Sequence, residues 1–183
     1  MRVEFRLSGS GGQGLLLAGI VLAEAVIQEG KNAIQTQSYG PEARGGSSKA
    51  EVVVSDTDID YPKATDPDYL LALTTDAYRS YGLSMKKGLI LVDTSVQVEP
   101  EAPVPVVKLP ILETASKKLG RGVVANMVAL GVLGGISGIA SPAALREAVR
   151  NRVPKGTEDL NLAAVDAGLA LAEEGKKQIE GGK

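Results

Sequence analysis

The fold is decided by the stretch Val3-Glu4-Phe5-Arg6-Leu7-Ser8-Gly9-Ser10-Gly11-Gly12-Gln13-Gly14, which runs directly into the apolar residues 15–27. Residues 3–7 predict a strand, residues 9–14 a tight glycine-rich loop, and residues 14–29 a helix that Gly30 ends. A strand that enters a helix through a glycine loop is typical of a Rossmann-like start. Because the apolar run is interrupted by Glu24 and is shorter than the roughly 20 residues of a membrane-spanning helix, we interpret it as a buried helix.

Strand and helix patterns follow one another along the rest of the chain. Strands are predicted at residues 33–37, 50–55, 69–74 and 89–92, and an edge strand is compatible with the proline-rich residues 104–109. Helices are predicted at residues 113–119, 123–136, 142–152 and 158–177, the third with Ser141 as N-cap and Pro142 at its first position. We therefore expect one α/β domain over residues 1–183, with a mostly parallel or mixed sheet flanked by helices and a helical C-terminal third.

Composition narrows the chemistry. The 183 residues are 44% hydrophobic and 23% charged, which is typical of a globular domain. The chain has no cysteine, so no thiolate can hold an iron–sulfur cluster, and no histidine, so the commonest general base and transition-metal ligand is missing. We expect no catalytic residue and no metal site in this chain by itself.

Charge and the N-terminal residues bear on partners and location. The formal net charge is -2, and there is no dense stripe of lysine and arginine, so neither nucleic acid nor an anionic membrane is expected as a partner. The apolar stretch before the first glycines is too short for a secretory signal, and we therefore expect a cytoplasmic protein.

The glycine loop allows three interpretations. Its G-x-G-x-x-G spacing at Gly9, Gly11 and Gly14 can present backbone N–H groups to a phosphate at the positive end of a helix. A dinucleotide site also needs an acidic residue at the end of the second strand, whereas residues 35–38 read Gln-Thr-Gln-Ser. The glycines can instead serve only a tight turn, or they can contact a ligand or a partner subunit.

A second loop is more distinctive. Residues 38–46 present one carboxylate and one guanidinium on a backbone shaped by glycines and a proline. They can form a solvated ion pair of less than about 1 kcal/mol. Alternatively, the planar guanidinium of Arg44 binds a carboxylate or phosphate across an interface. The candidate ligand or interface residues of the two loops are Gly9, Gly11, Gly12, Gln13, Gly14, Ser38, Tyr39, Gly40, Pro41, Glu42, Arg44, Gly45 and Gly46.

A third segment, residues 123–136, combines three glycines with alanines in one predicted helix. Because each helical glycine costs up to about 1 kcal/mol relative to alanine, something must pack closely here. The partner is either the domain's own sheet or another subunit. Asn126, near the helix start, is a further candidate site residue, although it can simply cap the helix or bond locally.

Taken together, residues 9–14, 18–19, 35–46, 50–55, 59–62 and 125–131 resemble the gamma subunit of 2-oxoacid:ferredoxin oxidoreductases over almost the whole chain. The wording of residues 37–46 is most similar to the 2-oxoglutarate branch, since the pyruvate branch usually has phenylalanine where Tyr39 stands. Ser10 departs from the family pattern, in which an aromatic residue is often found at this place. This difference at Ser10 affects only the prediction of which side chain covers the glycine loop.

The resemblance implies a role in a larger enzyme. In that family a 2-oxoacid, coenzyme A and oxidised ferredoxin give acyl-CoA, carbon dioxide and reduced ferredoxin. The complex uses thiamine diphosphate with Mg²⁺, held by alpha- and beta-type subunits, and iron–sulfur clusters held by cysteine-bearing subunits such as a ferredoxin-like delta subunit. The gamma subunit is expected to bind no cofactor alone, to be inactive in isolation, and to support assembly or the coenzyme A side of the site.

Two alternatives stay open at this point. One is a stand-alone α/β protein that binds a nucleotide or phosphate through the glycine loop. The other is a purely structural chain without a ligand.

Overall fold

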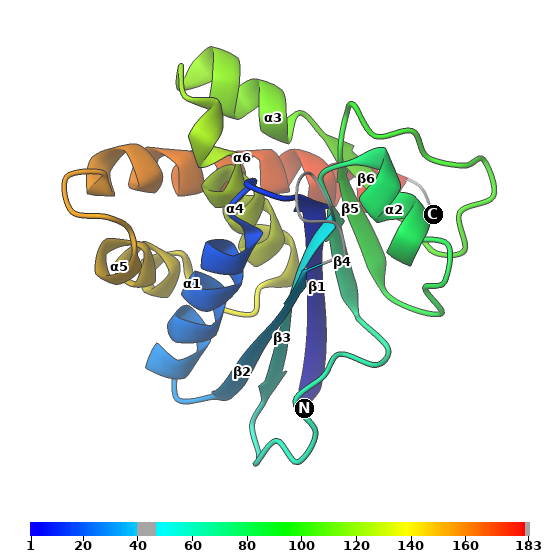
Figure 1. Cartoon of the computed structure of the whole chain (residues 1–183), viewed down its shortest axis with the longest axis horizontal. Coiled ribbons are helices and arrows are strands. Elements are labelled where there is room, and N and C mark those ends of the chain that lie inside the picture. Colours follow the sequence, from blue (N-terminus) through cyan, green and yellow to red (C-terminus); the bar gives the residue numbers. More distant parts are fainter. Residues whose placement is uncertain (40–46, 182–183) are drawn as a thin grey trace.

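The computed structural model describes residues 1–39 and 47–181, which form one α/β domain with a mixed sheet between helices (Figure 1). The strands are β1 (Arg2–Ser10), β2 (Asn32–Tyr39), β3 (Ser47–Ser55), β4 (Tyr69–Ala72), β5 (Leu89–Asp93) and β6 (Val106–Leu109). The helices are α1 (Leu15–Gln28), α2 (Thr75–Tyr81), α3 (Ile111–Glu113), α4 (Ala125–Ser137), α5 (Pro142–Arg152) and α6 (Glu158–Gly181). A π-helical turn, η1 (Thr114–Lys118), and a 3₁₀ turn, η2 (Gly122–Val124), join α3 to α4.

Two kinds of strand pairing meet at β1. Within the described residues the strand order is β2-β3-β1-β4-β5-β6. The pairs β1 with β4, β4 with β5, and β5 with β6 are parallel, whereas β3 runs antiparallel to both β1 and β2. The sheet is therefore mixed, as predicted, and β2 lies one strand away from β1.

The two faces of the sheet carry different cores. Alternate residues of β1 such as Phe5 and Leu7 are fully buried on the face covered by α1 and α4. The opposite face of β4 and β5 packs its Leu70 and Ile90 against α2, through Tyr78 and neighbouring residues. Figure 1 shows the heavier helical layer, α1, α4, α5 and α6, on one side of the sheet and the single α2 on the other.

The glycines of α4 pack against other helices. A Cβ on Gly131 would overlap the carbonyl oxygen of Val165 in α6, and one on Gly168 would overlap that of Val128 in α4. A Cβ on Gly134 would meet the end of the Leu145 side chain of α5. The sequence predicted that these glycines pack against the domain's own sheet or against another subunit. In the structure they pack against neighbouring helices of the same layer.

Several predicted boundaries were wrong. Ser38 was predicted to lie in a loop but belongs to β2, and β3 begins at Ser47 rather than at residue 50, because the two strands pair along their whole length. The helix expected at residues 113–119 begins at Ile111 and continues as the π-helical turn. Helix α2 was missed; its seven residues, capped by Thr74, are too few to show a helical period. The last helix extends to Gly181.

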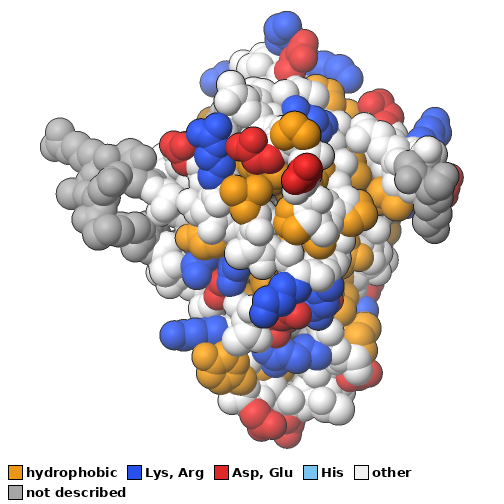
Figure 2. All heavy atoms as spheres, turned by 90° about the vertical axis from the view of Figure 1, so that its right-hand side faces the viewer, with side chains coloured by type: hydrophobic (Ala, Val, Ile, Leu, Met, Phe, Trp, Pro, Cys, Tyr) orange, Lys and Arg blue, Asp and Glu red, His pale blue; other side chains and the backbone are white. Residues whose placement is uncertain are grey.

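The surface shown in Figure 2 mixes both signs of charge. Lysine and arginine side chains lie among aspartate and glutamate, with small hydrophobic patches between them. Across residues 1–39 and 47–181, no helix has both the length and the apolar character that crossing a membrane requires.

Candidate functional site

The glycine loop lies at the carboxyl end of β1. Because β1 runs upward from the N-terminus in Figure 1, residues 11–14 sit at the upper end of the sheet, and α1 starts there. Gly11 and Gly12 are exposed, and a Cβ on Gly12 would meet open space, although its φ of 86° favours glycine. This part of the loop is accessible to a ligand or a partner.

The start of the loop is fixed from within. The Gln13 side chain folds back, so that its Oε1 accepts a hydrogen bond from the Ser10 amide at 2.8 Å. A Cβ on Gly9 would collide with that same oxygen. Gly9 and Gln13 therefore shape the turn, and this role supports the tight-turn interpretation for these two residues.

Gly14 and Asn126 meet although 112 positions separate them. Gly14 precedes α1 with a φ of 72°, and its carbonyl oxygen accepts a hydrogen bond from Asn126 Nδ2 at 3.1 Å. Asn126 Oδ1 accepts from the Met127 amide at 2.9 Å. A Cβ on Gly14 would lie 2.5 Å from Asn126 Nδ2, so the link needs glycine at this position. Asn126 is thus bonded both locally and across to the loop.

The hairpin of β2 and β3 brings the second motif to the same end of the sheet. Ser10 pairs with Ser47, and Gly9 pairs with Ser48, which in turn pairs with Tyr39. The backbone of residues 39 and 47, from which the connecting loop departs, is therefore adjacent to the glycine loop. The candidates Gly40, Pro41, Glu42, Arg44, Gly45 and Gly46 lie outside the described residues.

A row of charged side chains crosses the sheet below this end. Glu51 Oε1 accepts a hydrogen bond from Arg6 Nε at 2.8 Å and forms an ion pair with Lys49 Nζ at 3.2 Å. The guanidinium of Arg6 and the ammonium of Lys49 lie 5.1 and 5.6 Å from the centre of the Tyr81 ring. A cavity of about 190 Å³ lies over the row, lined by Thr36, Gln37, Ser38, Lys49, Glu51 and Lys63.

Sequence reasoning missed this charged row. The available signal was the alternation of Arg2, Glu4 and Arg6 with Val3, Phe5 and Leu7, because a period of two marks a strand with one polar face. That face is covered by residues 61–64, whose backbone carbonyl oxygens accept hydrogen bonds from Arg2 and Arg6, and by the Tyr81 ring of α2. Glu4 and Glu51 are therefore buried.

The arrangement can receive an anion or an acidic partner group. The start of α1 has no side-chain cap and no acidic residue in its first turn, so its partial positive charge is not neutralised locally. The dinucleotide hypothesis gains no support, since β2 ends without a carboxylate and is separated from β1 by β3.

The residues do not fit the redox cofactors of the resembling family. Without cysteine, the chain offers no thiolate for a cluster. No group of three His, Cys, Asp or Glu residues that could hold a metal ion occurs in the part of the chain that the structure describes.

Comparison with known proteins gives a consistent picture. The family model for pyruvate ferredoxin/flavodoxin oxidoreductase matches residues 4–171. The chain is 46% identical to the 2-oxoglutarate synthase subunit KorC of Methanothermobacter marburgensis, and the match covers 97% of this chain and 100% of that protein. The solved gamma subunit of a keto/oxoacid ferredoxin oxidoreductase from Geobacter sulfurreducens has a TM-score of 0.86 and 42% identity, over 96% of this chain and 98% of that chain.

A third relative is a larger polypeptide. The 2-oxoglutarate:ferredoxin oxidoreductase from Magnetococcus marinus, solved with 2-oxoglutarate, coenzyme A and succinyl-CoA bound, has a TM-score of 0.82 and 25% identity. The match covers 94% of this chain but only 31% of that chain, so the matching region there is part of a longer chain. On this evidence the chain belongs to the pyruvate ferredoxin/flavodoxin oxidoreductase family.

Proposed function

We propose that this chain is the gamma-type subunit of a 2-oxoacid:ferredoxin oxidoreductase whose preferred substrate is 2-oxoglutarate. The assembled enzyme converts the 2-oxoacid, coenzyme A and oxidised ferredoxin to acyl-CoA, carbon dioxide and reduced ferredoxin. This chain catalyses no step alone, because the chemistry requires thiamine diphosphate and clusters that other subunits hold.

The observation that carries this proposal is the 46% identity to a KorC subunit over that protein's whole length. Such a match covers the core, the glycine loop and the hairpin together, rather than one shared motif. It also favours the 2-oxoglutarate branch over the pyruvate branch, in agreement with the wording of residues 37–46.

Within the complex, we assign the upper end of the sheet to the contact with other subunits or with coenzyme A. The exposed Gly11 and Gly12, the uncapped start of α1 and the hairpin ends at residues 39 and 47 lie together there. Arg44 belongs to the segment between those ends. We expect its guanidinium to bind an anionic group of a neighbouring subunit or of coenzyme A.

The test is purification of the native complex and an assay of several 2-oxoacids with coenzyme A and a viologen acceptor. We expect viologen reduction to be fastest with 2-oxoglutarate and absent with the isolated chain. A clear preference for pyruvate, branched-chain oxoacids or indolepyruvate would contradict the substrate assignment. Activity of the pure single chain would contradict the supporting role.

Arg44 allows a test of the interface assignment. Arg44→Ala should weaken assembly or raise the Michaelis constant for coenzyme A by the equivalent of about 2 to 5 kcal/mol, while Arg44→Lys should restore function only partly. The melting temperature of the free variant separates this role from a structural one. Loss of stability in the free domain, or unchanged assembly and coenzyme A dependence, would show that the residue is structural or idle.

A further inference from the structure

Four polar side chains of β2 and β3 lie together on the face of the sheet that α2 covers. Thr36 pairs with Glu51. Ser38 pairs with Lys49, two residues further along each strand, so all four side chains share one face. The intervening Ala50 belongs to the core on the opposite, α1 face. The four side chains line the cavity of about 190 Å³ over the charged row.

A second lysine, Lys63, lines the same cavity from the segment that crosses this face. Two arginines of β1 hold that segment in place. Arg2 donates to the Lys63 carbonyl oxygen at 3.3 Å, and Arg6 donates to the Ala64 carbonyl oxygen at 2.8 Å. The ammonium of Lys63 forms no ion pair with any other described residue. The backbone of Lys63 is therefore fixed beside the cavity, while its charge has no partner in the described part of the chain.

Positive charge exceeds negative charge in the wall of this cavity. Among the described residues that line it, Glu51 is the one carboxylate, and its Oε1 is shared by Arg6 and Lys49. An ammonium group has three N–H donors, and the ion pair with Glu51 uses one donor of Lys49. Two ammonium groups and two hydroxyl groups thus surround one carboxylate, which the Arg6 guanidinium also neutralises. The cavity therefore favours an anion.

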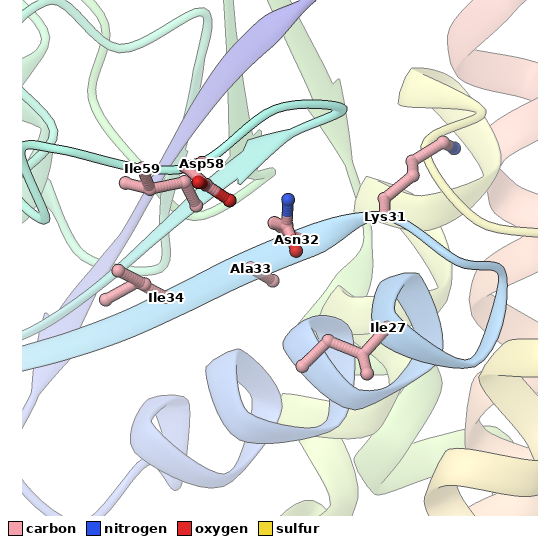
Figure 3. A pocket seen from close by; sticks show the side chains of 7 residues that line it. All are labelled: Ile27, Lys31, Asn32, Ala33, Ile34, Asp58 and Ile59. Atoms are coloured by element: carbon pink, nitrogen blue, oxygen red, sulfur yellow. The ribbon is translucent and has the colours of Figure 1, made fainter.

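The cavity at the other end of β2 lacks this excess of positive charge. It has a volume of about 310 Å³ and is lined by Ile27, Ala33, Ile34 and Ile59 together with Lys31, Asn32 and Asp58 (Figure 3). Figure 3 shows that the side chain of Lys31 extends away from Asp58, and its ammonium donates to the Ile139 carbonyl oxygen at 2.8 Å. One carboxylate and one engaged ammonium give that cavity no preference for an anion.

We propose that the cavity lined by Lys49 and Lys63 binds a single phosphate group, either inorganic phosphate or the terminal group of a small phosphate monoester. Lysine is an established phosphate ligand. Donors on two ammonium and two hydroxyl groups suit a tetrahedral group with three or more acceptor oxygens better than a planar carboxylate with two. A volume of about 190 Å³ is below that of ordinary cofactor pockets, so the cavity accommodates one such group and not a whole nucleotide or coenzyme A.

Titration of the free chain at constant ionic strength, followed by its amide NMR signals, tests the proposal independently of the proposed function. The probes are sodium phosphate, glycerol phosphate and sodium acetate. We expect the two phosphates to saturate shifts at residues 36–38, 49–51 and 63 with a dissociation constant on the order of 1 mM, as for two charge-assisted hydrogen bonds, and acetate to bind at least about tenfold more weakly.

The pattern of binding separates the possible outcomes. Tighter binding of glycerol phosphate would identify a monoester as the occupant, and tighter binding of inorganic phosphate would identify the free ion. Absence of saturation by either phosphate, or equal binding of acetate, would overturn the inference. Shifts concentrated at residues 11–15 would place the anion at the glycine loop and would also overturn it.

Matched lysine variants separate this cavity from general charge attraction. Lys63→Ala should weaken phosphate binding at least about tenfold, because one of the two ammonium groups is lost, and Lys63→Arg should restore most of it. The control Lys155→Ala removes an exposed ammonium that does not line the cavity and should bind phosphate like the parent. Both lysines are exposed, so the variants should melt like the parent. If Lys63→Ala and Lys155→Ala weaken binding equally, only the net charge matters and the inference is wrong.

Discussion

The outer strands of the sheet, β6 and β2, are both edge strands, but only one of them is closed. At β6, the side chain of Gln178 on α6 acts like a neighbouring strand: Oε1 accepts from the Lys108 amide at 3.2 Å, and Nε2 donates to the Lys108 carbonyl at 3.0 Å. At β2, the outward groups of Ala33, Gln35 and Gln37 have no comparable partner among the described residues. The same fold thus closes one edge internally, whereas the outward groups of the other edge stay unpaired among the described residues.

The closed side depends on α6, which is held by its contact with α4. The approach is so close that Gly131 and Gly168 face each other's helix backbone without side chains between them. On this side the apolar surfaces of α4 and α6 are therefore buried against each other within the domain. On the β2 side, the partly exposed Ile20, Ile27 and Ile34 have apolar surface that the domain itself does not cover.

The largest loss of stability is expected from a substitution that disturbs the contact between α4 and α6. Gly131→Ala would place a methyl group against the Val165 carbonyl, and separating two helices to admit it should lower the free energy of unfolding by roughly 3 kcal/mol. Chemical denaturation of the free chain measures this. The control is Gly122→Ala, which meets open space and should change stability by less than about 1 kcal/mol. Equal effects of the two substitutions would show that helix contact is not the cause.

The link between Asn126 and the glycine loop should matter next. Asn126→Ala removes the donor to the Gly14 carbonyl and the acceptor for the Met127 amide, and we expect a loss of about 1 to 2 kcal/mol. Asn126→Asp keeps the acceptor only. Because its buried carboxylate would face the Gly14 carbonyl oxygen without a donor between them, we expect Asn126→Asp to lower stability at least as much as Asn126→Ala. Parent-like stability in both variants would contradict this.

The two edges can be compared directly with one matched pair of glutamines. Gln178→Ala should cost the free chain about 1 kcal/mol, because both groups of Lys108 lose their partner. Gln37→Ala, which truncates an exposed side chain of β2, should cost less than about 0.5 kcal/mol. Thermal melting of both variants checks the difference. If the two losses are equal, Gln178 does not close the β6 edge in solution.

The smallest effect concerns the pH dependence of the β2 side. Partial burial raises the pKa of Glu24, but hydrogen bonds from Arg152 and Asn151 outweigh it and hold the pKa below the ordinary value of 4.5. A carboxylate with a lowered pKa contributes stability above its unfolded pKa and loses it as the pH falls through the folded value. Glu24→Gln should therefore be less stable than the parent at pH 7, with the difference shrinking below about pH 4. A difference that stays constant down to pH 3 would contradict this assignment.

Local patterns in the sequence were enough for much of this protein. Buried runs, capping residues and glycines at helix ends predicted α1, α5 and the strands, because these signals act over a few residues. The absence of cysteine and histidine excluded cluster binding through thiolates or imidazoles without any structure. The short α2 could not be predicted, since it is not long enough to show a period. A helix was predicted at residues 113–119, but its π-helical geometry at Thr114–Lys118 was not.

Only the tertiary structure decided which distant segments meet. Asn126 bonds to Gly14 across 112 positions, and Gln178 bonds to Lys108 across 70. Arg6 of β1 and Glu51 of β3, which lies between β1 and β2, are 45 positions apart. Local sequence preferences cannot predict such contacts. A backbone amide or a glycine has the same local preference whether or not a distant segment of the folded chain contacts it. The edge of β2 is of the same kind: its sequence predicts a strand, and only the sheet order shows that no strand of the described residues pairs with its outer side.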